Sequence, residues 1–219
     1  MIKAIIIQFR KDLLIETRNK TAIFLSLSLA LIVTISLSIL NNQKILPSEL
    51  YAELLWIVIF FSTHSILLHT FIREEDNNTN IILFYTVKPE VVFISKLIFN
   101  IIGTIVVSFF IVPLFIVLMN VAVKSWSILF VSIFCGIISY GSVATIVAAL
   151  ASKAGGREML FVLIVFPLVL PILIINMKLT ESVFRSGTID LFQLVFLLAF
   201  SIGIILLSIL LFPVIWSEQ

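Results

Sequence analysis

The chain has 219 residues, of which 61% are hydrophobic and only 12% are charged, and its mean hydropathy is +1.26. Soluble domains carry roughly 25% charged residues, so this composition excludes a soluble domain and indicates a chain that folds in a lipid bilayer. The net charge of +2 comes without a basic stripe interleaved with aromatic residues, and no nucleic-acid partner is expected.

The first twenty residues predict an amphipathic helix. Charges are spread through residues 1–20, which lack the apolar core and small-residue cleavage site of a signal peptide. At 100° per residue one narrow stripe is apolar: Ile2, Ile5, Ile6, Phe9 and Leu13. Lys11 and Arg18 lie on the far side, which is typical of a helix in the cytoplasmic interface of a membrane. A frayed polar tail stays open as the alternative, because further isoleucines and leucines blur the stripe.

Six long apolar segments follow. A helix needs about 20 apolar residues to cross roughly 30 Å of hydrocarbon, and the cost of unpaired backbone in lipid excludes open strands. The predicted spans are 21–41, 51–72, 97–120, 127–150, 159–177 and 191–214. We therefore expect an all-α integral membrane protein in which residues 1–219 form one transmembrane domain, with no room for a soluble catalytic domain.

The distribution of basic residues predicts the orientation, because short cytoplasmic loops are enriched in Lys and Arg. Five basic residues lie in the N-terminal segment, three in the second loop and two in the fourth, whereas the first, third and fifth loops together hold four. Both termini are therefore predicted to be cytoplasmic. The longest outer loop is then 178–190, whose apolar residues Leu179, Val183 and Phe184 we expect to lie against the outer membrane surface.

Two histidines lie in the second span, where ionisable side chains are functional candidates. His64 is near the middle of the span among hydroxyl side chains, and we favour a hydrogen bond to another helix. Contact with a translocated substrate or with haem, and a role in proton transfer, stay open. His69 lies near the cytoplasmic end and is interpreted as a solvated boundary residue. About 140° of helix rotation separates the two, which argues against joint ligation of one metal ion.

The segment REEDNNTNIILFYTVKPE, residues 73–90, connects the second and third spans on the predicted cytoplasmic side. Its acidic residues and the Asn-Asn-Thr run at 77–79 favour the start of a short helix, which the Lys-Pro pair at 88–89 would end. The apolar run 81–85 is unusual for a solvated loop. It either folds back on the membrane interface or docks in a groove of a soluble partner.

The fourth and fifth spans carry packing and bending signals. Small residues recur at every fourth position in the fourth span, which predicts close helix approach in lipid: Gly141, Thr145 and Ala149, and Ala144, Ala148 and Ser152. Cys135 lies in the same span and is interpreted as a packing residue. In the fifth span Pro167 and Pro171 predict a kink or a broken helix, with a hinge and a simple bend equally open.

The sequence offers no nucleotide or metal site. No segment matches the phosphate-binding pattern G-x-x-x-x-G-K-[ST], and there are no paired cysteines or C-x-x-C-H run. We therefore expect no cofactor, no metal and no catalytic residue in this chain. If it performs energised work, a partner must supply the ATP-binding site.

Several of these features together resemble ABC-2-type permeases. The motif residues are Phe71, Arg73, Glu74, Asp76, Thr79, Pro89 and Lys96. Within that group VAALASKAGGREMLFVLIVFPLVLPILI, residues 147–174, and LLWIVIFFSTHSILLHTFIREED, residues 54–76, resemble the CcmB family, the haem exporter B subunit of cytochrome c maturation. The run 77–79 departs from the acid-Gly-Thr or Gly-Ser turn expected there.

This resemblance implies a membrane permease subunit that is not an enzyme, lies in the bacterial cytoplasmic membrane and couples ATP hydrolysis to haem delivery or to release of a haem-loaded chaperone. ATP and Mg²⁺ would bind a partner ATPase, expected as a dimer. Haem would be handled by a C-type membrane subunit, a small membrane subunit and the chaperone on the outer face. The residues expected to couple to the ATPase are Arg73, Glu74, Glu75, Asp76, Thr79, Ile81, Leu83 and Phe84, with Lys153, Arg157 and Glu158 in the second cytoplasmic loop.

Two other functions are kept open. A general ABC-2 exporter of a lipid, drug or polysaccharide, working as a homodimer, would share the coupling loop but not the SKAGGRE loop or the double-proline span. An intramembrane enzyme would need polar groups at one depth, which only His64 and its hydroxyl neighbours approach. The family's haem-handling subunit has a tryptophan-rich outer loop, whereas Trp56, Trp126 and Trp216 are scattered here, so direct haem ligation by this chain is not expected.

Overall fold

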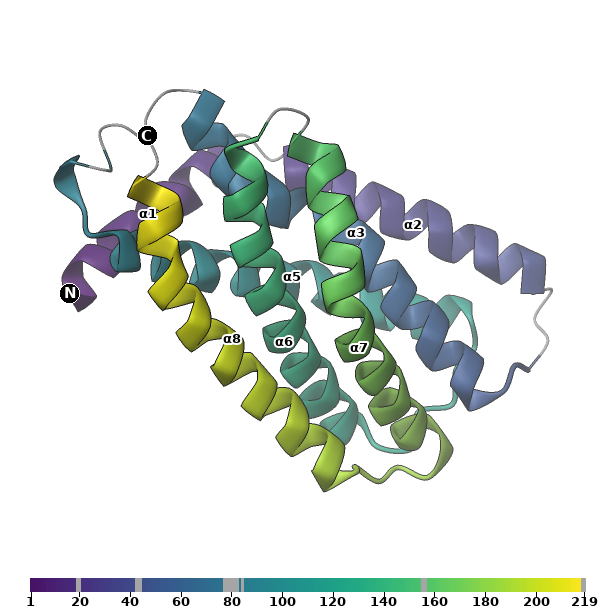
Figure 1. The fold of residues 1–219 in the computed structure, drawn as a ribbon. Coiled ribbons are helices and arrows are strands. Elements are labelled where there is room, and N and C mark those ends of the chain that lie inside the picture. The colour runs from purple at the N-terminus through teal and green to yellow at the C-terminus, as the bar shows by residue number, and fades with distance from the viewer. Residues whose placement is uncertain (19–20, 42–44, 77–82, 84, 155–156, 218–219) are drawn as a thin grey trace.

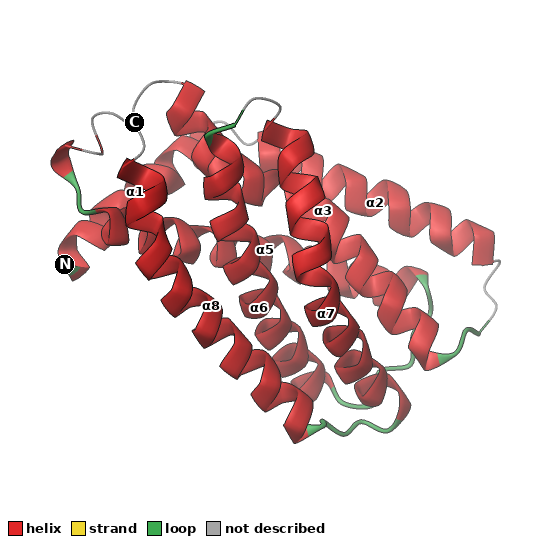
Figure 2. Cartoon of the chain, in the orientation of Figure 1, coloured by secondary structure: helices red, strands yellow, loops and turns green. Residues whose placement is uncertain are grey.

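The computed structural model describes the whole chain except residues 19–20, 42–44, 77–82, 84, 155–156 and 218–219. Within the described residues the chain is helical and contains no strand (Figure 2). The helices are α1 (Ile2–Arg18), α2 (Thr21–Asn41), α3 (Ser48–Asp76), α5 (Pro89–Leu118), α6 (Trp126–Ser152), α7 (Arg157–Arg185) and α8 (Leu191–Ser217).

The six predicted spans are confirmed. In the part of the chain that the structure describes, six helices are long and apolar enough to cross a membrane, and each corresponds to one predicted span: α2, α3, α5, α6, α7 and α8. Only α5 stops short of its predicted end, at Leu118 instead of residue 120. Several run beyond the predicted ends. α5, for example, begins at Pro89, because proline has the backbone angle of a first helical residue and its missing N–H is not needed there.

The central helix of the bundle is α6, which packs against α3, α5, α7 and α8 (Figure 1). Of its most apolar stretch 78% is buried, against 17% for α2 and α8, which therefore form the outer edges. Small residues on α6 allow this close packing, since Gly141, Ala144, Thr145, Ala148 and Ala149 are all buried. The interpretation of these residues as packing positions is confirmed.

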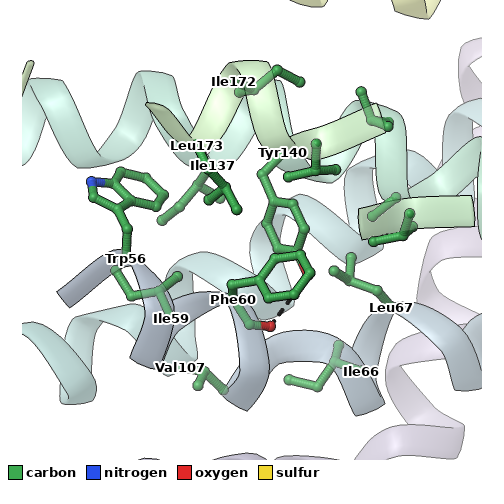
Figure 3. Packing of buried hydrophobic residues seen from close by; sticks show 14 of the residues in the cluster. Trp56, Ile59, Phe60, Ile66, Leu67, Val107, Ile137, Tyr140, Ile172 and Leu173 are labelled. Atoms are coloured by element: carbon green, nitrogen blue, oxygen red, sulfur yellow. Dashed lines mark hydrogen bonds between the residues drawn. The ribbon is translucent and has the colours of Figure 1, made fainter. Parts of the chain in front are cut away.

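Large aromatic residues fill the space between α3 and α6. The Phe60 and Tyr140 ring centroids lie 5.5 Å apart, and the Tyr140 hydroxyl lies 3.4 Å from the Phe60 carbonyl oxygen, to which it donates (Figure 3). Trp56 is completely buried, and its indole N–H donates to Thr180 Oγ1 at 2.9 Å. These contacts tie α3 to both α6 and α7.

The structure corrects two predictions about α7. The helix continues through Pro167 and Pro171, so the broken-helix alternative is wrong. It also runs on to Arg185, so the connection before α8 is shorter than the predicted outer loop 178–190. Leu179, Val183 and Phe184, which we expected on the outer membrane surface, are buried in the bundle because their helical spacing puts them on its inner face. The turn then uses Gly187 at φ 72°, a backbone angle that favours glycine.

The second span also ends later than predicted. α3 includes residues 73–76, which we had placed in the loop 73–90, and Pro89 starts α5. Of the predicted short helix, the described residues 83, 85 and 86 are helical and the Val87 N–H donates to the Leu83 carbonyl oxygen at 2.9 Å, before Lys88 and Pro89; the full extent of that helix stays a prediction. Glu74, Glu75 and Asp76 therefore lie at the C-terminal end of a helix, where the helix dipole disfavours negative charge. Nearby cations offset this cost, since Glu74, Glu75 and Asp76 each pair with a lysine or an arginine. The capping run 77–79 lies outside the described residues.

The N-terminal helix α1 packs on α5 through its polar side. Gln8, Asp12 and Glu16 are buried, whereas Ile2 and Leu13 of the predicted apolar stripe are exposed. The extent of α1 agrees with a helix over 1–20, and its place in the membrane interface stays a prediction. An apolar face turned away from the protein is what lipid contact requires.

We predict the following topology. The start of α1 and the end of α8 lie toward the same end of the bundle (Figure 1), as an even number of spans requires. Reporter fusions after Lys88 and after Arg157 should behave as cytoplasmic, and fusions near Lys44 and Arg185 as external. An external reading at Lys88 would contradict both this topology and a role of the neighbouring segment in contacting a cytoplasmic partner.

Candidate functional site

Four charged side chains gather where α1, α3 and α5 meet, and we call them the Lys96 cluster: Lys11, Asp12, Glu74 and Lys96. The Lys96 side chain is 0% exposed, and its Nζ lies 3.0 Å from Glu74 Oε2 and 3.8 Å from Asp12 Oδ2. Lys11 Nζ donates to Glu74 Oε1. Two cations thus face two carboxylates, which is necessary because an unpaired buried charge is strongly destabilising.

Two neutral contacts complete the surroundings of the Lys96 ammonium. Its Nζ donates to the Thr70 carbonyl oxygen at 2.7 Å and lies 5.0 Å from the centroid of the Phe71 ring. Thr70 and Glu74 are four residues apart on α3 and therefore approach Lys96 from the same helix face. The last turns of α3 are in this way held by a residue near the start of α5.

Asp12 differs from an ordinary surface carboxyl. Its burial raises its pKa above the usual 3.8, an effect that Lys96 and Lys11 oppose and that Glu74 reinforces. The folded chain therefore keeps a proton on Asp12 more readily than the unfolded chain does. As the pH falls from neutral through the raised pKa towards 3.8, protonation of this carboxyl favours the folded state, opposite to the usual behaviour of a salt-bridged aspartate.

A buried hydrogen-bond chain continues from the cluster into the bundle. One turn after Lys96 on α5, Asn100 Oδ1 accepts a hydrogen bond from Thr70 Oγ1 of α3, and Asn100 Nδ2 donates to Thr145 Oγ1 of α6 at 3.0 Å. All three side chains are buried. Polar side chains in a span are stable when they pair with neighbouring helices in this way, so α3, α5 and α6 are linked at this level.

A second group of charges joins the two segments predicted to face the cytoplasm, and we call it the loop junction: Glu75, Asp76, Lys153 and Arg157. Lys153 Nζ lies 3.5 Å from Glu75 Oε2, and Arg157 Nη1 donates to Asp76 Oδ1. Partly exposed ion pairs contribute only about 0–1 kcal/mol each. The junction therefore orients the end of α3 against the α6–α7 connection more than it stabilises the fold.

The loop junction borders an open pocket of about 680 Å³, lined by Ile72, Asp76, Lys153, Ala154, Arg157, Glu158 and Met159. Glu158 and Met159 begin α7 and Ile72 belongs to α3, so the pocket lies between these helix ends. Lys153 Nζ also lies 5.2 Å from the Trp216 ring centroid, which brings the end of α8 to the same place. The ends of α3, α6, α7 and α8 thus meet beside this open pocket.

The predicted coupling residues separate into three groups. Glu74 faces inward to Lys96, whereas Glu75 and Asp76 join the second loop as described. Leu83, which we expected to face a partner, is only 8% exposed and packs in this chain's own core, while Tyr85 is 81% exposed. Ile81, Phe84 and Thr79 lie outside the described residues, as does the Arg73 side chain.

His64 packs against an aromatic residue. Its ring centroid lies 4.6 Å from that of Phe161 on α7, and the described part of the chain contains no hydrogen-bond partner for His64, in contrast to the interhelical hydrogen bond that we favoured. His69 is half-buried near the end of α3. Among the described residues, no three His, Cys, Asp or Glu side chains gather in a way that could hold a metal ion.

We predict that His64 has a packing role. Because the ring contact with Phe161 is its principal interaction, His64→Phe should leave the protein level and cytochrome c content largely unchanged, and His64→Gln should cost little more. Haem-stained cytochrome c and the immunoblotted chain level are measured together in complemented cells. Loss of cytochrome c at a normal chain level, in both variants, would indicate that the imidazole contacts the substrate.

Sequence reasoning missed Asp12, Thr70, Asn100 and Thr145 as a connected set. A signal was present, since Gln8, Asp12 and Glu16 recur at every fourth residue and mark a polar face that needs partners. Lys96 and Asn100 show the same spacing in an otherwise apolar span. What could not be read from the sequence is that both faces meet the end of α3.

A family model described as CcmB protein matches residues 3–215. No curated protein matches the chain. The matched region contains the Lys96 cluster, the loop junction and the six membrane-spanning candidates, the last of them except for Trp216. Because the match covers almost the whole sequence, the chain belongs to the CcmB family and is the multi-pass permease of the haem exporter in the cytochrome c maturation system, which works with an ATPase subunit.

Proposed function

We propose that this chain couples ATP hydrolysis in a partner ATPase dimer to the release of a haem-loaded chaperone at the outer face of the bacterial cytoplasmic membrane. The ATPase would contact the segment after α3, including the exposed Tyr85, together with the α6–α7 connection. ATP and Mg²⁺ would bind the ATPase. Both termini of the permease would be cytoplasmic, as the basic residues indicate.

The observation that carries this proposal is the loop junction. Two segments that lie far apart in the sequence, at 75–76 and 153–157, are joined by ion pairs next to an open pocket of about 680 Å³. A partner that pushes on either segment therefore displaces both. Since α3 and α6 run from this place through the bundle, such a displacement would reach the opposite end.

We assign the binding of haem to partner subunits. Trp56 and Trp216 are buried among the core helices, and only Trp126 is exposed. The chain therefore offers no cluster of exposed tryptophans on which a haem plane could stack. A C-type membrane subunit, a small membrane subunit and the chaperone would handle haem. The general-exporter alternative is less well supported, since the family match extends over residues 3–215.

An experiment can distinguish a role in releasing the haem-loaded chaperone from a role in delivering haem to it. In cells that lack this chain but retain all other maturation proteins, we expect the chaperone to accumulate with bound haem and mature cytochrome c to fall to background. The wild-type chain should reverse both effects, but only when the ATPase can hydrolyse ATP. The measurement is haem staining of the chaperone and of cytochrome c from the same membranes. A chaperone that accumulates without haem would place the chain at haem delivery, and normal cytochrome c would contradict the proposal.

A further inference from the structure

The fully buried Lys96 lies near the start of the membrane-spanning helix α5 and contacts two other helices, α1 and α3. It begins in α5, pairs with Glu74 and the Thr70 carbonyl on α3, and reaches Asp12 on α1. An apolar residue at this position would suit a membrane helix better on hydropathy alone. The charge therefore calls for an explanation beyond packing.

The cluster defines one arrangement of α1. Asp12 is the α1 carboxylate that faces Lys96, and the rings of Phe9 and Phe99, whose centroids lie 6.3 Å apart, form a second contact between α1 and α5. If α1 moved along α5 by one turn, Asp12 would leave Lys96 and remain buried without that cation. A continuous apolar contact would resist such sliding far less, because every register of Leu and Ile packing is similar.

The same lysine also fixes the end of α3. Glu74 is one residue from Glu75 and two from Asp76, which form the loop junction. A displacement of the loop junction must therefore pull on Glu74, and through Lys96 on α5 and α1. One turn deeper, the hydrogen bonds of Asn100 to Thr70 and Thr145 would pass the displacement on to α6.

We propose that Lys96 is a positioning residue that makes α1, the end of α3 and the start of α5 move as one unit. Its consequence for coupling rests on the proposed function above, whereas its effect on α1 does not. Neutralising the lysine alone would strand buried carboxylates and could prevent folding. The informative variant is therefore Lys96→Met combined with Glu74→Gln, which removes one charge of each sign and nearly preserves side-chain volume.

The test is hydrogen–deuterium exchange of the purified permease complex, with ATP hydrolysis and cytochrome c content measured in parallel. In the double variant we expect amides of residues 2–18 to exchange about tenfold faster or more, because opening of a unit follows the stability of its contacts. Cytochrome c formed per ATP hydrolysed should fall severalfold while the ATPase remains bound. Lys153→Met is the matched control, since Lys153 also pairs with a glutamate of α3 and lies over an aromatic ring, and it should leave exchange in α1 unchanged.

The proposal would be overturned if amides of α1 exchanged in the double variant at the same rate as in the wild type. It would also be overturned if they exchanged as fast in the Lys153→Met control as in the double variant. If the double variant does not accumulate, Asp12→Ala serves in its place. It removes the contact between α1 and Lys96 and leaves the bonds from Gln8 and Lys11 to Glu74 in place. It should therefore speed exchange in α1 and leave residues 70–76 unchanged, and unchanged exchange in α1 would again overturn the proposal. Fast exchange in α1 of a chain that never binds an ATPase would refute the proposed function while the positioning role stands.

Discussion

Gly136→Ala should strongly destabilise the helical bundle. A methyl group at this position of α6 would lie 2.6 Å from Trp56 Cζ2 and 2.7 Å from Asn176 Oδ1, so two completely buried side chains from α3 and α7 would have to move. Trp56 has little freedom, because its indole N–H is held by Thr180 (Figure 3 shows its place in the core). Overpacking of this kind costs about 1–3 kcal/mol and occasionally more. The loss of stability is measured as the midpoint temperature of unfolding in detergent. Unfolding is monitored as the fraction of the chain that stays soluble and monodisperse.

Gly203→Ala is the matched control for this prediction. It is also a glycine inside a membrane-spanning helix, but a methyl group there meets nothing within 4 Å. Alanine is a better helix former than glycine by roughly 0.5–1 kcal/mol, so this variant should be as stable as the wild type or slightly more stable. Equal midpoints for the two variants would mean that Trp56, Asn176 and α6 do not pack as described.

Tyr85→Asp should remove the ATPase from the permease without lowering the permease level. The side chain, which lies between α3 and α5, is 81% exposed, so a charge there does not disturb this chain's own core. Aromatic residues are the commonest interface anchors, and loss of one costs about 2 kcal/mol or more, or roughly thirtyfold in affinity. Affinity purification of the tagged permease, with the recovered ATPase quantified, measures the effect. Tyr85→Phe retains the ring and should recover a nearly normal amount of ATPase.

Leu83→Asp is expected to act differently. Leu83 is buried in this chain, so the substitution places a charge among core residues and should lower the permease level itself. The sequence led us to expect Leu83 among the residues that contact the ATPase, and because its side chain packs in this chain's own core, that contact is tested at Tyr85 instead. A normal permease level for Leu83→Asp would show that this side chain faces outward after all.

The membrane-spanning helices could be predicted from the sequence because each requirement is local. Length and hydrophobicity decide whether a segment spans lipid, and the spacing of the small residues of α6 indicates close helix packing. The end of α7 was misjudged because polar residues such as Lys178 and Glu181 suggested a loop. The neighbouring apolar residues at positions 179, 183 and 184 followed a helical spacing that outweighed them.

The candidate site was predicted less completely, because its partners are remote in the sequence. Glu74 was identified as part of a motif, but its cations at positions 11 and 96 lie on two other helices. Nothing local distinguishes Glu74, which turns inward, from Glu75 and Asp76, which turn to the second loop. Only the packing of α1 and α5 around α3 decides which acid is buried.

Site-specific photo-cross-linking in the assembled complex tests directly where the ATPase contacts the permease. A benzophenone amino acid is placed at Tyr85, an exposed residue between α3 and α5, or at Phe192, an exposed aromatic residue at the other end of α8 from Trp216. We predict a cross-link to the ATPase from position 85 and none from position 192. An intact complex that cross-links the ATPase from neither position, or equally from both, would contradict the claim that this end of α3 is where the permease receives the movement driven by ATP.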